Sequence, residues 1–257
     1  MKLKVCTFNL RLRCISDGEN YFDNRLPLIV KTLKEELPDI IGFQEMTHEM
    51  RKMLTENLPE YSMVGGGREL NRDGESSCIA FLRTKFTLCE AETRWLSFEP
   101  KTPGSVYTGL DQSRCPRAFT YALLTEIYGG KPFGVLNVHT DHLGQKSRML
   151  ASSAMLSFLS EKQAETAFPF IMTGDFNALP DSEEIKMIKS VGNITEITEG
   201  VGDTFHNFGK AKGYGQIDYI FATNDFKSQS LRKIDARDGA LYISDHHPIV
   251  AELTLGE

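Results

Sequence analysis

Cysteine is scarce in this sequence, and the few cysteines form no pairing pattern. The chain has an odd number and no CxxC pair: Cys6, Cys14, Cys78, Cys89 and Cys115. A disulfide framework normally has an even number of cysteines, and a structural zinc site has closely spaced ligand pairs. The pattern argues against both. It favours free thiols in a reducing compartment, and we expect a cytoplasmic protein.

Long hydrophobic runs are also absent. No segment approaches the ~18 consecutive apolar residues that a membrane-spanning helix needs. The first residues, MKLKVCTFNLRLR, are interrupted by charge throughout and lack the apolar core of a signal peptide. No repeat, low-complexity tract or Pro/Ser-rich linker divides the chain. We therefore expect one domain over residues 1–257, with no membrane partner and no obligate protein partner.

Positive charge is in deficit. The chain has 29 Lys and Arg against 35 Asp and Glu, a formal net charge of −6. This balance argues against a protein that coats nucleic acid by bulk electrostatics. A nucleic-acid enzyme remains compatible with it, because bound divalent cations and a few local arginines supply positive potential inside an acidic molecule.

Apolar periodicity predicts two groups of strands, each accompanied by helices. Helical spacing of apolar residues appears over 26–37, opened by Asp23 or Asn24, and again over 47–58, 145–165 and 182–189. Strand patterns cover 3–10, 39–45, 61–67, 76–83, 86–91, a hairpin over 118–140 that turns at Gly129-Gly130, then 168–177, 217–223 and 248–255. Such a pattern suggests two sheets packed face to face with helices outside, an α/β chain with mixed or antiparallel strand order.

Polar residues interrupt or end nearly every apolar run. For any single one, an ordinary strand-terminating residue is the better interpretation, but this many oxygen and imidazole donors favour one convergent site. Carboxylates and carboxamides without thiolates suit a hard cation such as Mg²⁺ or Mn²⁺. The positions are Asn9, Glu45, His139, Asp175, Asn177, Asp218, Asp245 and His246.

Two short spacings refine this prediction. Asp175 and Asn177 are two residues apart, so an extended backbone would aim both at one face. Asp245 and His246 are adjacent, so they share a site only if the segment "SDHH" is a turn, which Ser244 favours. Because Pro248 pushes His247 toward an extended conformation, we interpret His247 as structural and His246 as catalytic.

The motifs together resemble the endonuclease/exonuclease/phosphatase superfamily, the metal-dependent fold of DNase I and the abasic-site endonucleases. They occur in order along essentially the whole chain: "TFNLR", "GFQE", "GRELNRDGES", "CPRAFTYALL", "NVHTDH", "TGDFN", "QIDYIF" and "SDHHPIVAEL". The segments "RDGES" and "NVHTDHLG" are most similar to the branch of deadenylases and nocturnin, although Val138 and Thr140 depart from its usual text. The resemblance implies a four-layer α-β-β-α sandwich of two mixed sheets flanked by helices.

The resemblance also implies roles around a metal and a water. Asn9 and Glu45 should hold the principal Mg²⁺ or Mn²⁺, with Asp245 as a further or outer-sphere ligand. Asp175 should orient or deprotonate the attacking water. Asn177 should bind a nonbridging phosphate oxygen or a second metal.

Three further roles concern the phosphate. By the same resemblance, His246 should contact the scissile phosphate, Asp218 should set its tautomer, and His139 should stabilise the phosphate from the opposite side. This division suits the chemistry, because an anionic transition state needs cations and preorganised donors. An Asp–His pair keeps one imidazole nitrogen aimed at the substrate.

Several charged residues are candidates for substrate binding. Arg117 enters an apolar strand, so it either forms a structural ion pair, for example with Glu45 or Glu75, or contacts phosphate directly. Arg148 has the position of a helix-surface residue that buttresses the site. The predicted substrate-binding set is Arg68, Arg72, Glu75, Arg117 and Arg148.

The sequence thus predicts a Mg²⁺- or Mn²⁺-dependent phosphoesterase that hydrolyses a P–O bond by in-line attack of water. Phosphodiester cleavage of RNA, DNA or a nucleotide is the leading form, and the resemblance suggests 3′→5′ exonuclease action on RNA. An alternative is a phosphatase acting on small monoesters such as inositol phosphates or nucleotide cofactors. A non-catalytic module that binds a phosphorylated ligand is a third possibility, which the presence of every expected donor disfavours.

Overall fold

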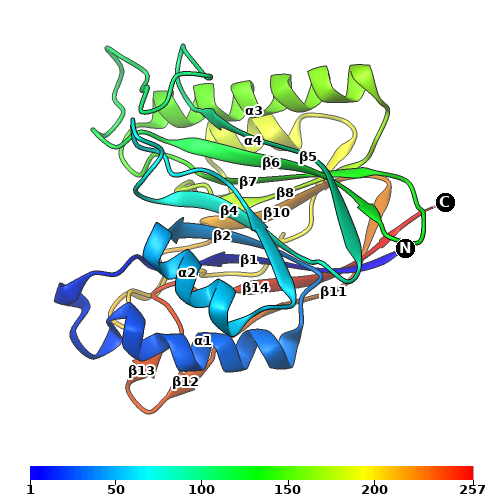
Figure 1. Cartoon of the computed structure of the whole chain (residues 1–257). Helices are drawn as coiled ribbons and strands as arrows, with labels where there is room; N and C mark the ends of the chain where they lie inside the picture. Colours follow the sequence, from blue (N-terminus) through cyan, green and yellow to red (C-terminus); the bar gives the residue numbers. More distant parts are fainter. Residues whose placement is uncertain (257) are drawn as a thin grey trace.

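The computed structural model describes residues 1–256 and has four layers (Figure 1). Two six-stranded sheets lie face to face, and helices cover the outer face of each. The predicted α-β-β-α sandwich of two mixed sheets is confirmed. Within each sheet one strand pair is parallel, β1 with β2 and β7 with β8, and the other pairs are antiparallel.

The first sheet has the strand order β11-β14-β1-β2-β4-β3 and is covered by α1 and α2. Thr47 caps α2, its side chain accepting a hydrogen bond from the backbone NH of Met50 at 3.4 Å. Leu37, in the left-handed region just before Pro38, ends α1. The bounds are β1 Lys2–Asn9, α1 Phe22–Glu36, β2 Ile40–Met46, α2 His48–Asn57, β3 Tyr61–Val64, β4 Ser76–Leu82, β11 Phe226–Lys233 and β14 Ile249–Leu255.

The second sheet has the order β5-β6-β7-β8-β10-β9 and is covered by α3 and α4. The hairpin between β6 and β7 turns at Gly129, whose φ is +92°, as predicted. The bounds are β5 Phe86–Trp95, β6 Ala118–Glu126, β7 Phe133–His139, α3 Gln145–Glu165, β8 Phe170–Asp175, α4 Glu183–Lys189, β9 Ile194–Glu196 and β10 Asp218–Thr223. A 3-10 helix, Ile15–Asn20, and a small hairpin of β12 Arg237–Asp238 and β13 Leu241–Tyr242 complete the fold.

Alternating side chains of the strands separate into two kinds of core. On β1, Val5 joins the layer between the sheets, whereas Cys6 packs toward α1 and α2. This two-residue period is what lets one strand serve both layers. Each large apolar side chain that is fully buried there contributes about 1.5–3 kcal/mol of transfer free energy.

The sheets approach each other closely at one point. Gly42 on β2 faces Asn137 and Thr173 of the other sheet, and a Cβ there would overlap with the Thr173 hydroxyl oxygen. Gln44 donates to Asn137 Oδ1 at 2.7 Å across the same gap. Only glycine leaves room for this polar contact, which ties the two sheets together near their strand ends.

Some elements differ from the sequence prediction. The strand β11 was not predicted, because it is an edge strand whose side chains mostly face solvent and which therefore lacks apolar alternation. The short β9, β12 and β13 were missed for lack of length. The strand predicted over 86–91 extends to Trp95, and the one predicted over 61–67 ends at Val64.

Candidate active site

The two parallel strand pairs bring chain-distant polar residues to one edge of the sandwich. In the second sheet, His139 of β7 and Asp218 of β10 both lie opposite Asp175 of β8 in the strand register. In the first sheet, Asn9 ends β1 beside β2, which carries Glu45. The Asn9 amide nitrogen donates to Asp175 Oδ2 at 2.9 Å and to Glu45 Oε1 at 3.2 Å, joining the sheets.

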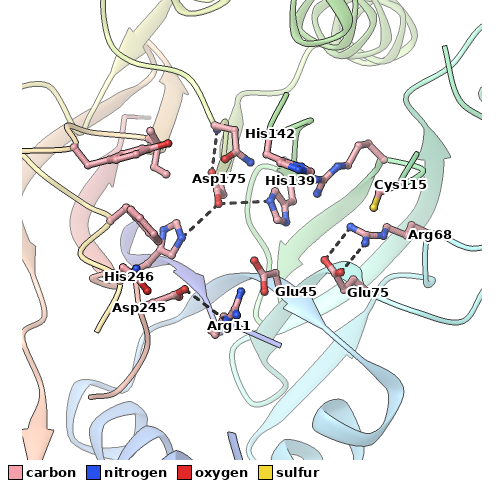
Figure 2. Close-up of a pocket in the computed structure, with 16 residues that line it drawn as sticks. Arg11, Glu45, Arg68, Glu75, Cys115, His139, His142, Asp175, Asp245 and His246 are labelled. Atoms are coloured by element: carbon pink, nitrogen blue, oxygen red, sulfur yellow. Dashed lines mark hydrogen bonds and ion pairs between the residues drawn. The ribbon is translucent and has the colours of Figure 1, made fainter. Parts of the chain in front are cut away.

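A cleft of about 410 Å³ opens at this edge (Figure 2). Nine of the thirteen predicted site residues line it: Glu45, Arg68, Glu75, Arg117, His139, Asp175, Asn177, Asp245 and His246. Two more, Asn9 and Asp218, lie directly behind the lining residues and hydrogen-bond to them. The site is therefore assembled mostly from the residues that the sequence singled out.

His246 is held as an imidazolium by buried carboxylates. Its Nδ1 donates to Asp218 Oδ2 at 2.8 Å, and its Nε2 lies 3.8 Å from Asp175 Oδ2. Burial alone would lower the pKa of His246, but Asp218 above all, with Asp175 and Asp245, outweighs it and raises the pKa to about 10. His246 therefore presents a positively charged donor to the cleft.

Asp175 is a carboxylate with an unusually high proton affinity. Burial, followed by the charge of Asp218, raises the pKa of Asp175 to about 7, against the opposing effect of His246. The backbone NH of Asn177 donates to Asp175 Oδ1 at 2.9 Å. The predicted extended backbone is wrong here: Asn177 has a φ of +47°, and this turn brings both residues to the cleft.

Glu45 and Asp245 are the carboxylates best placed for a divalent cation. Both line the cleft, and Glu45 is fixed by the backbone NH of Leu12, which donates to Oε2 at 2.8 Å. Burial, and the nearby charge of Glu45, raise the pKa of Asp245 despite the opposing charge of His246. Two crowded carboxylates of this kind are the oxygen ligands that Mg²⁺ and Mn²⁺ prefer, so the residues present fit the predicted metal.

Asn9 joins the two carboxylates. Its amide nitrogen donates to both, and its oxygen accepts one hydrogen bond, from the backbone NH of Arg11 at 2.9 Å. The amide oxygen keeps a second lone pair, so the predicted role of Asn9 as a metal ligand stays a prediction. The hydrogen bonds of its nitrogen also position Glu45 and Asp175.

Asp175, Asp218 and His246 lie close enough to be considered a metal-binding group, with ligand atoms within 4.8 Å of one another. His246 Nδ1 donates its proton to Asp218 Oδ2 at 2.8 Å. A ring nitrogen that carries this proton has no lone pair to offer to a metal ion. The geometry therefore favours a proton-handling array at this position.

The segment "SDHH" is turned as predicted. The Ser244 hydroxyl lies 2.7 Å from the carbonyl oxygen of Asn9 and accepts a long hydrogen bond from the His246 NH at 3.4 Å. These contacts aim Asp245 and His246 into the cleft together. His247 points elsewhere: its Nδ1 lies 3.3 Å from a carbonyl oxygen outside the cleft, in keeping with a structural role.

Arg11 was missed, although it stands two residues after Asn9 in the motif "TFNLR". Its guanidinium contacts Asp17 through two nitrogens at 3.0 Å each, and its Nε lies 3.7 Å from Asp245 Oδ2 (Figure 2). The carbonyl of Arg11 accepts a hydrogen bond at 2.8 Å from Arg25, a fully buried arginine. These contacts hold a positive charge next to Asp245, one of the carboxylates predicted to hold the metal, and strand patterns do not reveal this position.

Backbone strain concentrates at the cleft. Four of the seven non-glycine residues with positive φ in residues 1–256 line it: Arg11, Glu45, Asn177 and Asn207. Such conformations cost about 1–3 kcal/mol each and persist where the surroundings impose them. Their clustering is typical of a functional site.

The two ends of the cleft differ in chemistry. At the His246 end, Phe205 packs edge-on against Tyr214 and His246, each with a ring-centroid distance of 5.0 Å. At the other end lie Arg68, paired with Glu75 at 2.6 and 2.9 Å, and Arg117. The residues that line the cleft without having been predicted are Arg11, Cys115, His142, Phe205, Asn207, Tyr214 and Ile217.

Two predicted substrate-binding arginines lie outside the cleft. Arg148 pairs with Glu184 at 2.6 Å and donates to the carbonyl oxygen of Asp141, so it is tied to α4. Arg72 is exposed and lies over the ring of Trp95. Neither arginine lines the cleft, because Arg148 pairs with the buried Glu184 and Arg72 lies on the surface, and their contact with substrate stays a prediction. Arg117 is buried, but its ionic contact is with Asp141, and neither Glu45 nor Glu75 pairs with it.

A model of the endonuclease/exonuclease/phosphatase family matches residues 6–246 of the chain. The chain belongs to this family, whose members hydrolyse phosphate esters. A Bacteroides vulgatus protein of the family is 29% identical, with a TM-score of 0.92 and 99% coverage of both chains. The mannosyl-6-phosphatase of Bacteroides thetaiotaomicron is 28% identical, with a TM-score of 0.89, covering 98% of this chain and 100% of its own.

The catalytic domain of human nocturnin shares the fold at a lower level. It is 19% identical, with a TM-score of 0.77, covering 99% of this chain and 93% of its own. The family match over residues 6–246 confirms the predicted superfamily, while the resemblance to the nocturnin branch extends to the fold alone. In the described part of the chain, no helix combines the length and apolar character that crossing a membrane requires.

Proposed function

We propose that this protein is a divalent-metal-dependent phosphoesterase with a small phosphorylated molecule as its substrate. The observation that carries the proposal is the buried array of Asp175, His246 and Asp218 beside the carboxylates of Glu45 and Asp245. A base, a charged donor and a pair of metal-type ligands around one cleft are the parts that phosphoryl transfer to water requires.

In this mechanism Asp175 orients the attacking water and accepts its proton. A carboxyl group with a pKa near 7 is matched to that task at neutral pH. The imidazolium of His246 donates from Nε2 to a phosphate oxygen and stabilises the charge that develops there. Asp218 keeps the proton on Nδ1, and Asn9 holds Asp175 in place.

A divalent cation held by Glu45 and Asp245 would polarise a phosphoryl oxygen as a Lewis acid. The bond from the water oxygen to phosphorus forms as Asp175 takes the proton of the water, and the bond from phosphorus to the ester oxygen breaks. The departing alkoxide takes up a proton from solvent and leaves as the alcohol, and Asp175 returns its proton to solvent. His139 stays neutral near pH 7, because burial and then the charges of Arg117 and Arg68 lower its pKa well below 6.5. It therefore serves as a neutral hydrogen-bonding group beside Asp175, 3.6 Å from its carboxylate.

A small monoester is the preferred substrate class. The relative named as a mannosyl-6-phosphatase is 28% identical over nearly the full length of both chains. The cleft of about 410 Å³ has the size of a small-molecule site, and the acidic net charge of −6 suits a small ligand better than a long polyanion.

The second candidate is the phosphodiesterase that the sequence placed first, acting as a 3′→5′ exonuclease on RNA. Its support is the shared fold of nocturnin and the aromatic pair of Phe205 and Tyr214, which could stack on a base. We place it second because the 19% identity to nocturnin carries no likeness of substrate.

The test compares hydrolysis of mannose 6-phosphate, bis(p-nitrophenyl) phosphate and a short 3′-hydroxyl RNA, each with Mg²⁺, Mn²⁺ or EDTA. Monoester turnover alone supports the first candidate, and shortening of the RNA by single nucleotides supports the second. Turnover that persists in EDTA would contradict the metal requirement.

The variant Asp175→Asn should lower turnover by about 10²–10⁴-fold, the usual contribution of a general base. Its circular dichroism spectrum should match that of the wild type. Asp181→Asn, the same change at an exposed position, is the control and should retain full activity. Wild-type turnover by Asp175→Asn would refute the assigned mechanism.

A further inference from the structure

The end of the cleft away from His246 forms a pocket of which the proposed chemistry uses only His139. We call Arg68, Cys115, Arg117, His139 and His142 the arginine pocket. In Figure 2, His246 and Asp245 lie on one side of Asp175, whereas His139, His142, Cys115 and Arg68 lie on the other. The hydrolytic centre and the arginine pocket are thus neighbouring parts of one cleft.

Arg117 is the central residue of this pocket, and it is only 5% exposed. Its Nη2 lies 2.9 Å from His142 Nδ1, and its Nε lies 3.6 Å from Asp141 Oδ2. Within residues 1–256, Arg117 Nε and Nη1 have no hydrogen-bond partner. A buried guanidinium with unpaired donors is costly unless an acceptor reaches it.

Asp141 cannot meet this need, because other donors already occupy its carboxylate. It accepts hydrogen bonds from Ser113 through both the backbone NH and the hydroxyl, and from the backbone NH groups of Leu143 and Gly144. These bonds fix Asp141 as the anchor of its own loop. The positive charge of Arg117 is consequently only partly compensated.

His142 adds a second donor at the mouth of the pocket. A guanidinium only donates, so His142 Nδ1, which faces Arg117 Nη2, must be the accepting nitrogen. In the neutral ring the proton then sits on Nε2. His142 is exposed and lines the cleft, so this N–H is available to a ligand.

Unpaired polar atoms concentrate here. Six buried side-chain polar atoms in residues 1–256 lack a hydrogen-bond partner, and four of them belong to Arg68, Arg117 and His139. Three of those four are N–H donors of arginines. Such a concentration of donors in one concave place is what an oxyanion-binding site looks like before its ligand arrives.

We propose that the arginine pocket binds a second oxyanion of the substrate, separate from the phosphate that is hydrolysed. The substrate class is then a small molecule with two anionic groups, such as a sugar bisphosphate. This inference rests on the proposed function for the identity of the first anion, and on the donors of Arg117 and His142 for the second.

The charges around the two anion sites predict that only the hydrolytic centre needs a metal to bind phosphate. The hydrolytic centre is built from carboxylates, among them Glu45, Asp175 and Asp245, so a phosphate binds there only with a divalent cation. In the arginine pocket Glu75 offsets the charge of Arg68 and Asp141 offsets part of that of Arg117. The unpaired N–H donors of Arg117 and the Nε2–H of His142 remain, and they need no metal to receive an anion. Inorganic phosphate should therefore distinguish the two places by its dependence on metal.

The test is calorimetric titration of the full chain with inorganic phosphate in EDTA. We expect the wild type to bind one phosphate per chain, and Arg117→Met to bind it at least about tenfold more weakly, the loss expected for a charge-assisted hydrogen bond. Arg83→Met, the same change at an exposed position, should bind as the wild type does. Adding Mg²⁺ should reveal a second phosphate in the wild type, which Arg117→Met retains.

A second variant keeps the proposal testable if Arg117→Met does not fold. His142 is exposed, so His142→Ala should fold normally and should weaken metal-free phosphate binding severalfold. If the wild type binds no phosphate in EDTA, the pocket serves the scissile phosphate and the inference is overturned. Failure of hydrolysis in every substrate assay would instead count against the proposed function, because the titration in EDTA requires no turnover.

A pair of sugar phosphates tests the substrate class directly. With Mg²⁺ present, glucose 1,6-bisphosphate should bind the wild type at least about tenfold more tightly than glucose 6-phosphate does, since it adds one charge-assisted contact. Arg117→Met should abolish that preference. Equal binding of the two ligands by the wild type would contradict the proposed second anion.

Discussion

Replacement of Asp218 by asparagine tests the electrostatic basis of the site. The His246 Nδ1 to Asp218 Oδ2 hydrogen bond is 2.8 Å long, and both side chains are almost fully buried. The variant keeps the shape of the side chain and an acceptor oxygen but removes the charge. Although burial favours the neutral ring, Asp218 does most to raise the pKa of His246 to about 10, so the variant should lower that pKa.

The magnitude follows from the loss of one buried charge-assisted hydrogen bond, about 1.5–3 kcal/mol. A change of about 1.4 kcal/mol in an activation free energy is tenfold in rate, so kcat/KM at pH 8 should fall about 10- to 150-fold. The direction in which activity changes with pH follows from the protonation of His246. His246 must be protonated to donate from Nε2, so activity is lost as the pH rises through its pKa, and Asp218→Asn moves this loss to lower pH.

The assay is the pH profile of kcat/KM from pH 5 to 10.5, measured with the substrate that the activity screen identifies. Asp238→Asn, at an exposed position of β12, is the matched control and should reproduce the wild-type profile. An alkaline limb that stays in place in Asp218→Asn, with kcat/KM within twofold of the wild type, would refute a catalytic role for protonated His246.

Three further predictions use other parts of the structure. Arg11→Met should tighten Mg²⁺ binding severalfold in calorimetry, because the positive charge that repels the metal at the carboxylates is lost, and it should raise KM about tenfold, because the same charge attracts the anionic substrate. Unchanged values of both would show that Arg11 has no part in the site. Gly42→Ala should lower the free energy of unfolding in urea by about 1–3 kcal/mol through overlap with Thr173, whereas Gly192→Ala, at an open position, should not. Burial, and then neighbouring histidines, lower the pKa of His206 to about 4. The unfolded chain therefore binds more protons between about pH 4 and 6.5, stability should rise with pH across that window, and His206→Gln should flatten the rise.

The positions of the strand ends followed directly from local patterns. Asn9, Asp175 and Asp218 each interrupt or border a run of apolar residues with strand periodicity, and that signal survives without tertiary information. The same logic failed at β11, whose outward-facing polar side chains carry no alternation. It also failed at Asn177. An extended strand was expected to place Asp175 and Asn177 on one face, but a left-handed conformation at Asn177 brings both to the cleft.

The residues that sequence reasoning missed share a different property. Arg11, Phe205 and Tyr214 look like ordinary loop or strand-flanking residues, and only the folded chain brings them to the cleft. Arg117 illustrates a related limit of sequence reasoning, which concerns its contact partners. Its burial was expected, but its partners, Asp141 and His142, could not be chosen from the sequence among several nearby charged residues.

The sequence by itself determined the family. The types of donor and their order along the chain are covalent facts, and their resemblance to the endonuclease/exonuclease/phosphatase family predicted a phosphate-ester hydrolase. Carboxylates with imidazoles and no paired thiols predict, in addition, a hard cation wherever they meet. Only the tertiary structure decided which donors meet. His139 and Asp218 flank Asp175 because of strand register, and Asn9 reaches Asp175 because two sheets pack together. Register and packing depend on contacts between residues far apart along the chain, from 36 positions for His139 and Asp175 to 166 for Asn9 and Asp175, and no local pattern encodes them.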